Sequence, residues 1–93
     1  MIEFKVGFSK RFIKRMKKHR QDTNVLNALR GVIAYFEVWD RLPVSYRDHK
    51  LKGMYRGYRE FHLFPDLLVI YKKDELTGMI TFTDIGSHSG LFG

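Results

Sequence analysis

Apolar positions near the N-terminus alternate with charged ones, which is the pattern of a β-strand with one buried face. Over residues 2–6 the apolar side chains are Ile2, Phe4 and Val6. Gly7 is expected to end the strand, because glycine is unfavourable inside one. The chain is therefore predicted to enter its fold through a short N-terminal strand.

Two amphipathic helices are predicted next. In the first, which Ser9 can cap, apolar residues recur every four positions. The second begins after Asp22 or Thr23 and keeps apolar residues at helical spacing to about Trp39. The connection between them is short, so we expect an antiparallel helical hairpin whose apolar stripe faces the core. A Leu-Pro pair at 42–43 ends the helical pattern.

Three strand-like runs occupy the C-terminal half, at 58–64, 67–72 and 79–84. A Pro-Asp turn at 65–66 joins the first two, and the sequence KDELTG at 73–78 forms a hairpin loop between the others. Because the connections are short, neighbouring strands are expected to be antiparallel. The middle run is apolar on both faces, which places it at the centre of the sheet.

These elements predict an α+β fold in a single domain over residues 1–93. It comprises an N-terminal strand, an antiparallel helical hairpin and a mainly antiparallel three-stranded meander. The helices are expected on one face of the sheet, which leaves the other face for a site. A chain of 93 residues is long enough to bury a modest core.

The formal net charge of +7 indicates a polyanionic partner such as RNA, DNA, an anionic membrane or an acidic protein. No Asp or Glu lies between Lys5 and Gln21, although cations crowd the polar face of the first predicted helix. This run is either a solvated helix face or a cradle for phosphates or an acidic partner. Its cations include Lys10, Arg11, Lys14, Arg15, Lys17 and Lys18.

The chain contains no Cys, which fits a reducing cytosol. It has neither a signal-peptide pattern nor an apolar run long enough to span a membrane. We therefore expect a soluble, unprocessed protein that does not associate with membranes.

Side chains able to transfer protons gather between Tyr46 and Asp66. In the strand predicted at 58–64, Glu60 and His62 share one face and Arg59 points to the other. Further candidates are His49 and Asp66 in the same stretch and His88 in the sequence GSHSGLF near the C-terminus. We predict that these two segments meet.

Histidine titrates near neutral pH, so a set of imidazoles and carboxylates suits paired acid–base work. Zinc ligation by His49, His62, His88 and Asp66 is chemically admissible, but these residues lack a recognisable ligand spacing. The sequence therefore predicts neither a metal nor another cofactor.

RNA carries its own nucleophile in the 2′-hydroxyl, so its cleavage needs a base, an acid and cations for the phosphorane charge. The candidate phosphate ligands are Arg59, Lys50, Lys52 and Arg56. Phe92 or Tyr55 can stack a base.

The segment HKLKGMYRGYREFHLFPDLLVIYK, followed by GSHSGLF, resembles the YafQ-type branch of the RelE/ParE toxin superfamily of bacterial type II toxin–antitoxin systems. With the preceding strand and hairpin, the resemblance covers essentially the whole chain. It implies a ribosome-dependent mRNA endoribonuclease that attacks through the 2′-hydroxyl and is neutralised by an antitoxin with an acidic C-terminal segment.

The resemblance also assigns active-site roles. It implies that His88 and His62 are the principal proton-transfer pair, that Asp66 assists them and that His49 lies near the phosphate. It leaves open which group is the acid and which is the base. The basic first helix would contact ribosomal RNA. The active-site residues implied are His49, Glu60, His62, Asp66, His88 and Phe92.

Two positions depart from the resemblance. Leu67 stands where related sequences often have Trp, which removes a stacking side chain. Asp84 lies in the stretch before Gly86 where many carry Arg, so Arg59 or a loop Lys would have to supply that charge.

Two other functions remain open. A ParE-like toxin would inhibit a target such as DNA gyrase by binding alone, because a fold does not determine its function. A basic RNA-binding domain would lose affinity with salt but would not depend on its histidines.

Overall fold

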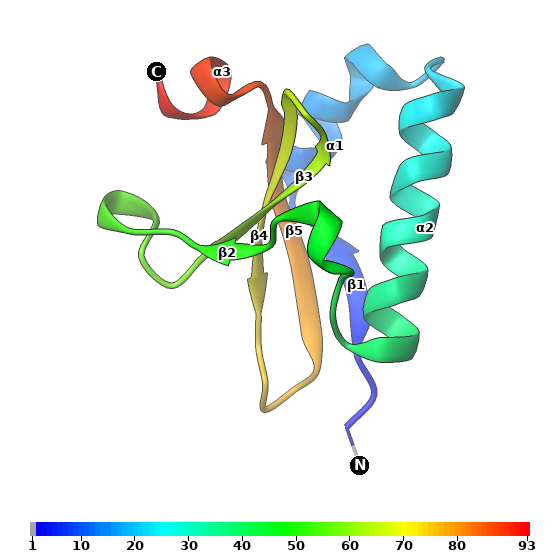
Figure 1. Cartoon of the computed structure of the whole chain (residues 1–93), viewed down its shortest axis with the longest axis vertical. Coiled ribbons are helices and arrows are strands. Elements are labelled where there is room, and N and C mark those ends of the chain that lie inside the picture. Colours follow the sequence, from blue (N-terminus) through cyan, green and yellow to red (C-terminus); the bar gives the residue numbers. More distant parts are fainter. Residues whose placement is uncertain (1) are drawn as a thin grey trace.

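The structure, a computed structural model, describes residues 2–93, and a sheet runs through its centre (Figure 1). In chain order the elements are β1 (Lys5–Phe8), α1 (Lys10–Met16), α2 (Thr23–Trp39), β2 (His49–Lys50), β3 (Arg59–Phe64), β4 (Leu67–Lys73), β5 (Met79–Gly86) and α3 (His88–Phe92). Short 3-10 turns lie at Lys17–His19, Val44–Tyr46 and Gly53–Tyr55. The α+β class and the helical hairpin followed by a meander are therefore confirmed.

The sheet has the order β1-β5-β4-β3-β2. The predicted meander of β3, β4 and β5 is antiparallel, as expected, whereas β1 lies parallel to β5. At the opposite edge, β2 adds a two-residue strand antiparallel to β3, which the sequence pattern did not reveal.

The first strand begins and ends later than predicted, and Gly7 lies inside it. Pairing with β5 decides its limits, because Lys5 N donates to Gly78 O at 2.9 Å and the strand then follows Met79 to Phe82. A Cβ atom at Gly7 would meet only the terminal methyl group of Met79, an exposed side chain that can shift. The strand therefore continues through this glycine.

Side-chain caps start both helices of the hairpin. Ser9 Oγ accepts a hydrogen bond from Phe12 N at 3.1 Å, and Asp22 Oδ1 accepts one from Val25 N at 3.2 Å. Of the two predicted caps, Asp22 is the one used, and α2 ends at Trp39 as expected. No helix among residues 2–93 is both long enough and apolar enough to cross a membrane.

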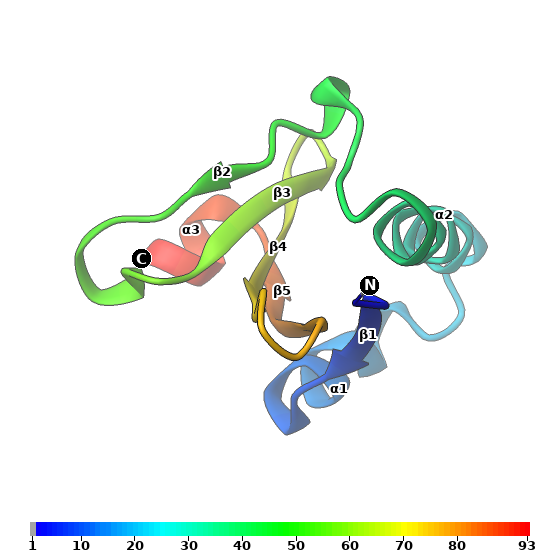
Figure 2. The same cartoon turned by 90° about the horizontal axis from the view of Figure 1, so that it is seen from below.

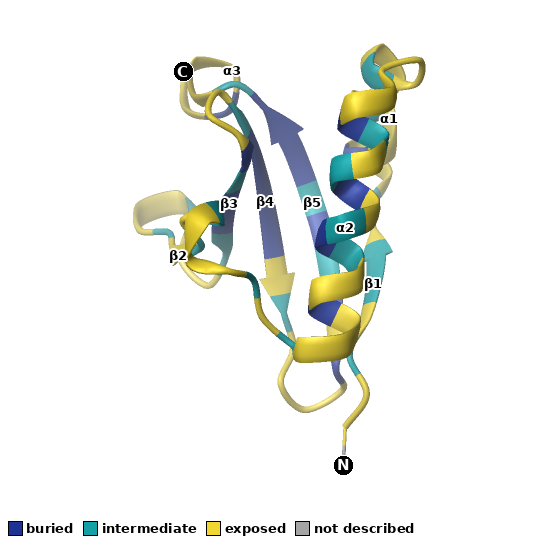
Figure 3. Ribbon diagram, turned by 45° about the vertical axis from the view of Figure 1, so that its right-hand side comes forward, coloured by how far each residue is buried: buried dark blue, intermediate teal, exposed yellow. Residues whose placement is uncertain are grey.

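One face of the sheet carries the main core, under α1 and α2 (Figures 2 and 3). The ring of Phe36 from α2 packs edge-on against Phe61 at 6.0 Å and Phe82 at 6.0 Å. The aliphatic members Val32, Val69 and Ile80 are fully buried beside these rings. This core confirms that the helical hairpin covers one face.

The opposite face carries a smaller apolar cluster beneath α3. Leu91 of α3 packs on Leu68 and Ile70 of β4. In the sequence GSHSGLF, Ser87 caps a short helix by accepting a hydrogen bond from Gly90 N at 3.0 Å. Thus α3 covers part of this face and leaves the β2–β3 edge open.

Candidate active site

The candidate acid–base residues lie on the face opposite the helical hairpin. His49 pairs with Glu60 across β2 and β3, and Glu60 pairs in turn with Ile70 on β4. Cross-strand neighbours project to the same side of a sheet, so these side chains form one row. The predicted shared face of Glu60 and His62 is confirmed by the burial of Phe61 in the main core.

Glu60 lies between two imidazoles. Its Oε1 is 3.5 Å from His49 Nε2 and 4.0 Å from His62 Nε2. The residue is only 4% exposed, and its Oε2 has no hydrogen-bond partner among residues 2–93. A buried carboxylate oxygen without a partner is costly, and such groups are retained where their chemistry is needed.

The other nitrogen of His49 is held by the preceding loop. His49 Nδ1 lies 2.7 Å from the carbonyl oxygen of Arg47, so the ring donates to that acceptor. Both nitrogens of His49 therefore face oxygen atoms, and both donate only when the ring is doubly protonated. The half-exposed His49 ring and the less exposed His62 ring lie 6.5 Å apart between centroids.

A second group of candidate residues surrounds α3. Asp66 Oδ1 accepts a long hydrogen bond of 3.4 Å from His88 N at the start of this helix. The ring of Phe92 lies 5.2 Å from that of His88 and 5.5 Å from that of Tyr55. The segment around 46–66 and the C-terminal segment therefore meet, as predicted.

The structure separates the predicted residues into two adjacent groups. Within residues 2–93, no hydrogen bond or ring contact joins the imidazoles of His62 and His88. They are linked through β4, because His62 pairs with Leu68 and Leu68 pairs with Gly86, two positions before His88. His62 also lines a cavity of about 390 Å³ with Tyr46 and Arg47.

The predicted phosphate ligands are not gathered around Glu60. Arg59, Lys50 and Arg56 instead line a cavity of about 650 Å³, and Lys52 is exposed on the loop after β2. The cause is alternation along the strands, since Lys50 pairs with Arg59 on the side away from Glu60.

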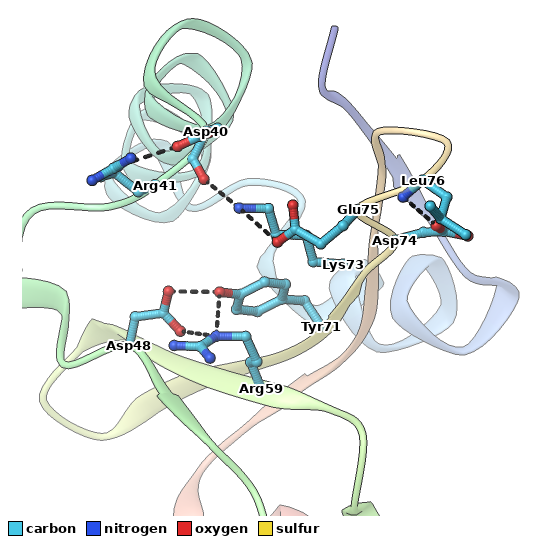
Figure 4. Close-up of polar contacts among 9 residues, drawn as sticks. All are labelled: Asp40, Arg41, Asp48, Arg59, Tyr71, Lys73, Asp74, Glu75 and Leu76. Carbon is cyan, nitrogen blue, oxygen red and sulfur yellow. Dashed lines mark hydrogen bonds and ion pairs between the residues drawn. The ribbon is translucent and has the colours of Figure 1, made fainter. Parts of the chain in front are cut away.

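Arg59 is bound within the protein. Its Nε donates to Asp48 Oδ1 and to the Tyr71 hydroxyl, both at 3.1 Å (Figure 4). Burial lowers the pKa of Arg59, but the hydrogen bond to Tyr71 and the charge of Asp48 outweigh that effect, so the pKa is raised. Arg59 is thus committed to a structural network that sequence reasoning missed. The sequence carries one signal of this network. Tyr71 shares the buried face of its strand with Val69, and a buried tyrosine hydroxyl requires a hydrogen-bond partner.

Asp84 anchors α1 to the last strand. It is 3% exposed and lies 3.9 Å from Arg11 Nη1 and 3.6 Å from Arg15 Nε. Both arginines also line a groove of about 580 Å³ with Lys14, Lys17 and Lys18. Asp84 lies in the stretch where many related sequences have Arg, and two arginines of α1 lie beside this position.

Leu67 packs against the main core. A side chain in this orientation points away from Glu60 and cannot stack on a substrate there. Among residues 2–93 no group of three or more His, Asp or Glu side chains is arranged to hold a metal ion.

Comparisons with known proteins match nearly the whole chain. Residues 4–93 match the model of one family, described as bacterial toxin of type II toxin-antitoxin system, YafQ. The chain is 35% identical over 92 residues to the mRNA interferase toxin YafQ of Escherichia coli (strain K12), covering 99% of this chain and 95% of that relative.

Solved structures share the fold as well. The chain is similar to one in the crystal structure of the E. coli DinJ-YafQ toxin-antitoxin complex, with a TM-score of 0.82, 30% identity and coverage of 99% of this chain and 100% of that one. It is also similar to a metal-bound toxin from Helicobacter pylori, with a TM-score of 0.83, 34% identity and coverage of 96% and 99%.

Proposed function

This chain belongs to the YafQ family of bacterial toxins of type II toxin–antitoxin systems, and we propose that it is an mRNA interferase that cuts message on the ribosome in the cytoplasm. The observation that carries this proposal is the buried Glu60 carboxylate between the imidazoles of His49 and His62. A binding-only toxin has no need for a buried carboxylate oxygen that lacks a partner.

The reaction needs two proton transfers and no added reactant. A base removes the proton of a 2′-hydroxyl, and the oxygen attacks the adjacent phosphorus as the bond to the 5′-oxygen breaks. An acid protonates that leaving oxygen, so the products are a 2′,3′-cyclic phosphate and a free 5′-hydroxyl. Each positioned proton transfer typically contributes about 10² to 10⁴ in rate.

We assign these roles to the two adjacent groups of side chains. His62 on β3, whose Nε2 lies 4.0 Å from Glu60 Oε1, belongs to the first group. His88 on α3, with Asp66 at the start of that helix, belongs to the second. His49 contributes positive charge near the phosphate. The exposed ring of Phe92, which contacts Tyr55, offers a surface on which a base can stack.

The basic surface of α1 provides contacts for ribosomal RNA. Arg11, Lys14, Arg15, Lys17 and Lys18 line one groove, and two of them, Arg11 and Arg15, also lie near Asp84. Such a surface gains affinity by displacing counterions from phosphates. By analogy with the DinJ-YafQ complex, we further propose that a cognate antitoxin with an acidic segment neutralises this toxin.

The test is primer extension of mRNA on translating ribosomes with the wild type, His62→Gln and His88→Gln. Arg30→Gln, an exposed change on α2, serves as the folded control. We expect discrete cuts in the message with the wild type and the control, and a loss of at least about 10² in each histidine variant. Growth arrest with intact mRNA would contradict the proposal and favour inhibition by binding alone.

A further inference from the structure

A second cavity lies on the other side of β2 and β3 from Glu60. Its volume of about 650 Å³ falls within the range of small-molecule sites. The loop after β2, the end of α2 and the β4–β5 hairpin supply its walls. Figure 4 shows lining side chains from the end of α2, from β3 and from β4 and the hairpin that follows it. The space is large enough for one nucleotide.

Most charges in this cavity already have partners. Arg59 is bound by Asp48 and Tyr71, as described above. Lys73 Nζ donates to the carbonyl oxygen of Asp40 at 2.7 Å and lies 3.6 Å from Glu75. Arg41 is bound by the Asp40 carboxylate at 3.1 Å. These groups shape the cavity and have little charge left for a ligand.

Two cations remain available. Lys50 and Arg56 line the same cavity, are exposed, and make no ion pair within residues 2–93. Leu51 and Tyr58 also line it, but their side chains pack with the smaller apolar cluster on the α3 face, and Lys72 Nζ lies 5.4 Å from the centre of the Tyr58 ring. Gly57 has a φ of 93°, which favours glycine and turns the chain next to Arg56. A ligand with an anionic group matches the two available cations.

The cavity continues from the proposed active site. Lys50 follows His49 in β2, so the two side chains project to opposite faces of the sheet. Because β2 is an edge strand, a polymer can pass over it from one face to the other. An RNA strand with one phosphate at His49 would then present a neighbouring nucleotide to Lys50 and Arg56.

We propose that this cavity binds one nucleotide of the message beside the cleaved bond, with Lys50 and Arg56 on its phosphate. The inference rests on the proposed function for the identity of the ligand. An acidic peptide would be attracted by the same two cations, but it would not be drawn there by a neighbouring phosphate at His49.

The test measures binding without cleavage. The probe is a 2′-O-methyl hexanucleotide, whose blocked hydroxyls prevent the reaction, titrated against the wild type, Lys50→Gln, Arg56→Gln and the charge-matched control Arg30→Gln. Each cavity variant should weaken binding about threefold to tenfold. Each should also reduce the slope of log K against log salt by about 0.7. Amide chemical shifts should change most at Gly57 and Tyr58.

Three outcomes would overturn the proposal. The first is equal affinity and salt slope in the cavity variants and the Arg30→Gln control, including the case in which none binds. The second is a shift map centred on α1. The third is equally tight binding of a hexaglutamate peptide at the same amides, which would assign the cavity to an acidic protein. The separate cleavage assay with wild type on ribosomes tests the proposed function, so the two failures are distinguishable.

Discussion

The hydroxyl of Tyr71 donates a 2.6 Å hydrogen bond to Asp48 Oδ2, across a separation of 23 residues. Asp48 directly precedes His49, and β2 itself consists of only two residues. This bond therefore fixes the position of His49 relative to Tyr71, which belongs to the main core. The Arg59 bonds to both partners complete the attachment.

Asp48→Ala should lower both stability and activity. It leaves the buried Tyr71 hydroxyl without an acceptor, which costs about 1–3 kcal/mol, and it releases the backbone before His49. Urea unfolding and ribosome-dependent cleavage measure the two effects. If the residues act as one unit, Tyr71→Phe made in the Asp48→Ala background should cost less than Tyr71→Phe alone. Additive losses would show that the bond does not couple them.

Stability should decline at alkaline pH because of Tyr71. Burial first, and the hydrogen bond to Asp48 second, raise the pKa of Tyr71 above its ordinary value. The unfolded chain releases this proton near pH 10, whereas the folded protein keeps it, so the contribution is complete below about pH 10 and is lost as the pH rises further.

Urea unfolding between pH 8 and 11 measures this decline. Tyr71→Phe should flatten it, while Tyr35→Phe, a change at a partly exposed position, should not. Parallel curves for the wild type and Tyr71→Phe would show that other groups cause the alkaline loss.

Glu60→Gln should separate activity from stability. The change keeps the shape of the side chain but removes a buried charge whose second oxygen lacks a partner. We expect an unfolding free energy equal to or above that of the wild type, together with about a 10²-fold loss of cleavage. Activity within a few-fold of wild type would remove Glu60 from the acid–base group.

Two glycines with positive φ should respond differently to alanine. Gly53 has a φ of 66° and open space around it, so Gly53→Ala should cost about 1–2 kcal/mol from backbone conformation alone. Gly78 has a φ of 79°, and a Cβ there would also collide with the carbonyl oxygen of Glu3. Gly78→Ala should therefore cost clearly more, as thermal unfolding can measure. Equal losses of unfolding free energy in the two variants would show that the segment before β1 shifts to make room for the new methyl group.

Local patterns predicted most of the fold and the shared face of Glu60 and His62. Period-two alternation placed these two residues on one face, and cap residues located the starts of the first two helices, because these features depend on neighbours within a few residues. The same alternation placed Arg59 on the opposite face, so the pattern itself gave little support to a phosphate role for Arg59.

The missed features depend on pairings between distant segments. The attachment of Asp48 to Tyr71 and of Asp84 to Arg15 spans 23 and 69 residues, so neither could be predicted from local spacing. The two-residue β2 exists only because β3 offers it an edge. Likewise, the C-terminal helix packs on apolar residues of β4 that a turn would have left uncovered.

The parallel pairing of β1 with β5 has a consequence for the synthesis of this protein. The first strand to leave the ribosome finds its only sheet neighbour near the end of the chain, at residues 79–82. The nascent polypeptide therefore cannot close its sheet, or place His88 beside it, until translation is nearly finished. The candidate active site is therefore completed only at the end of synthesis.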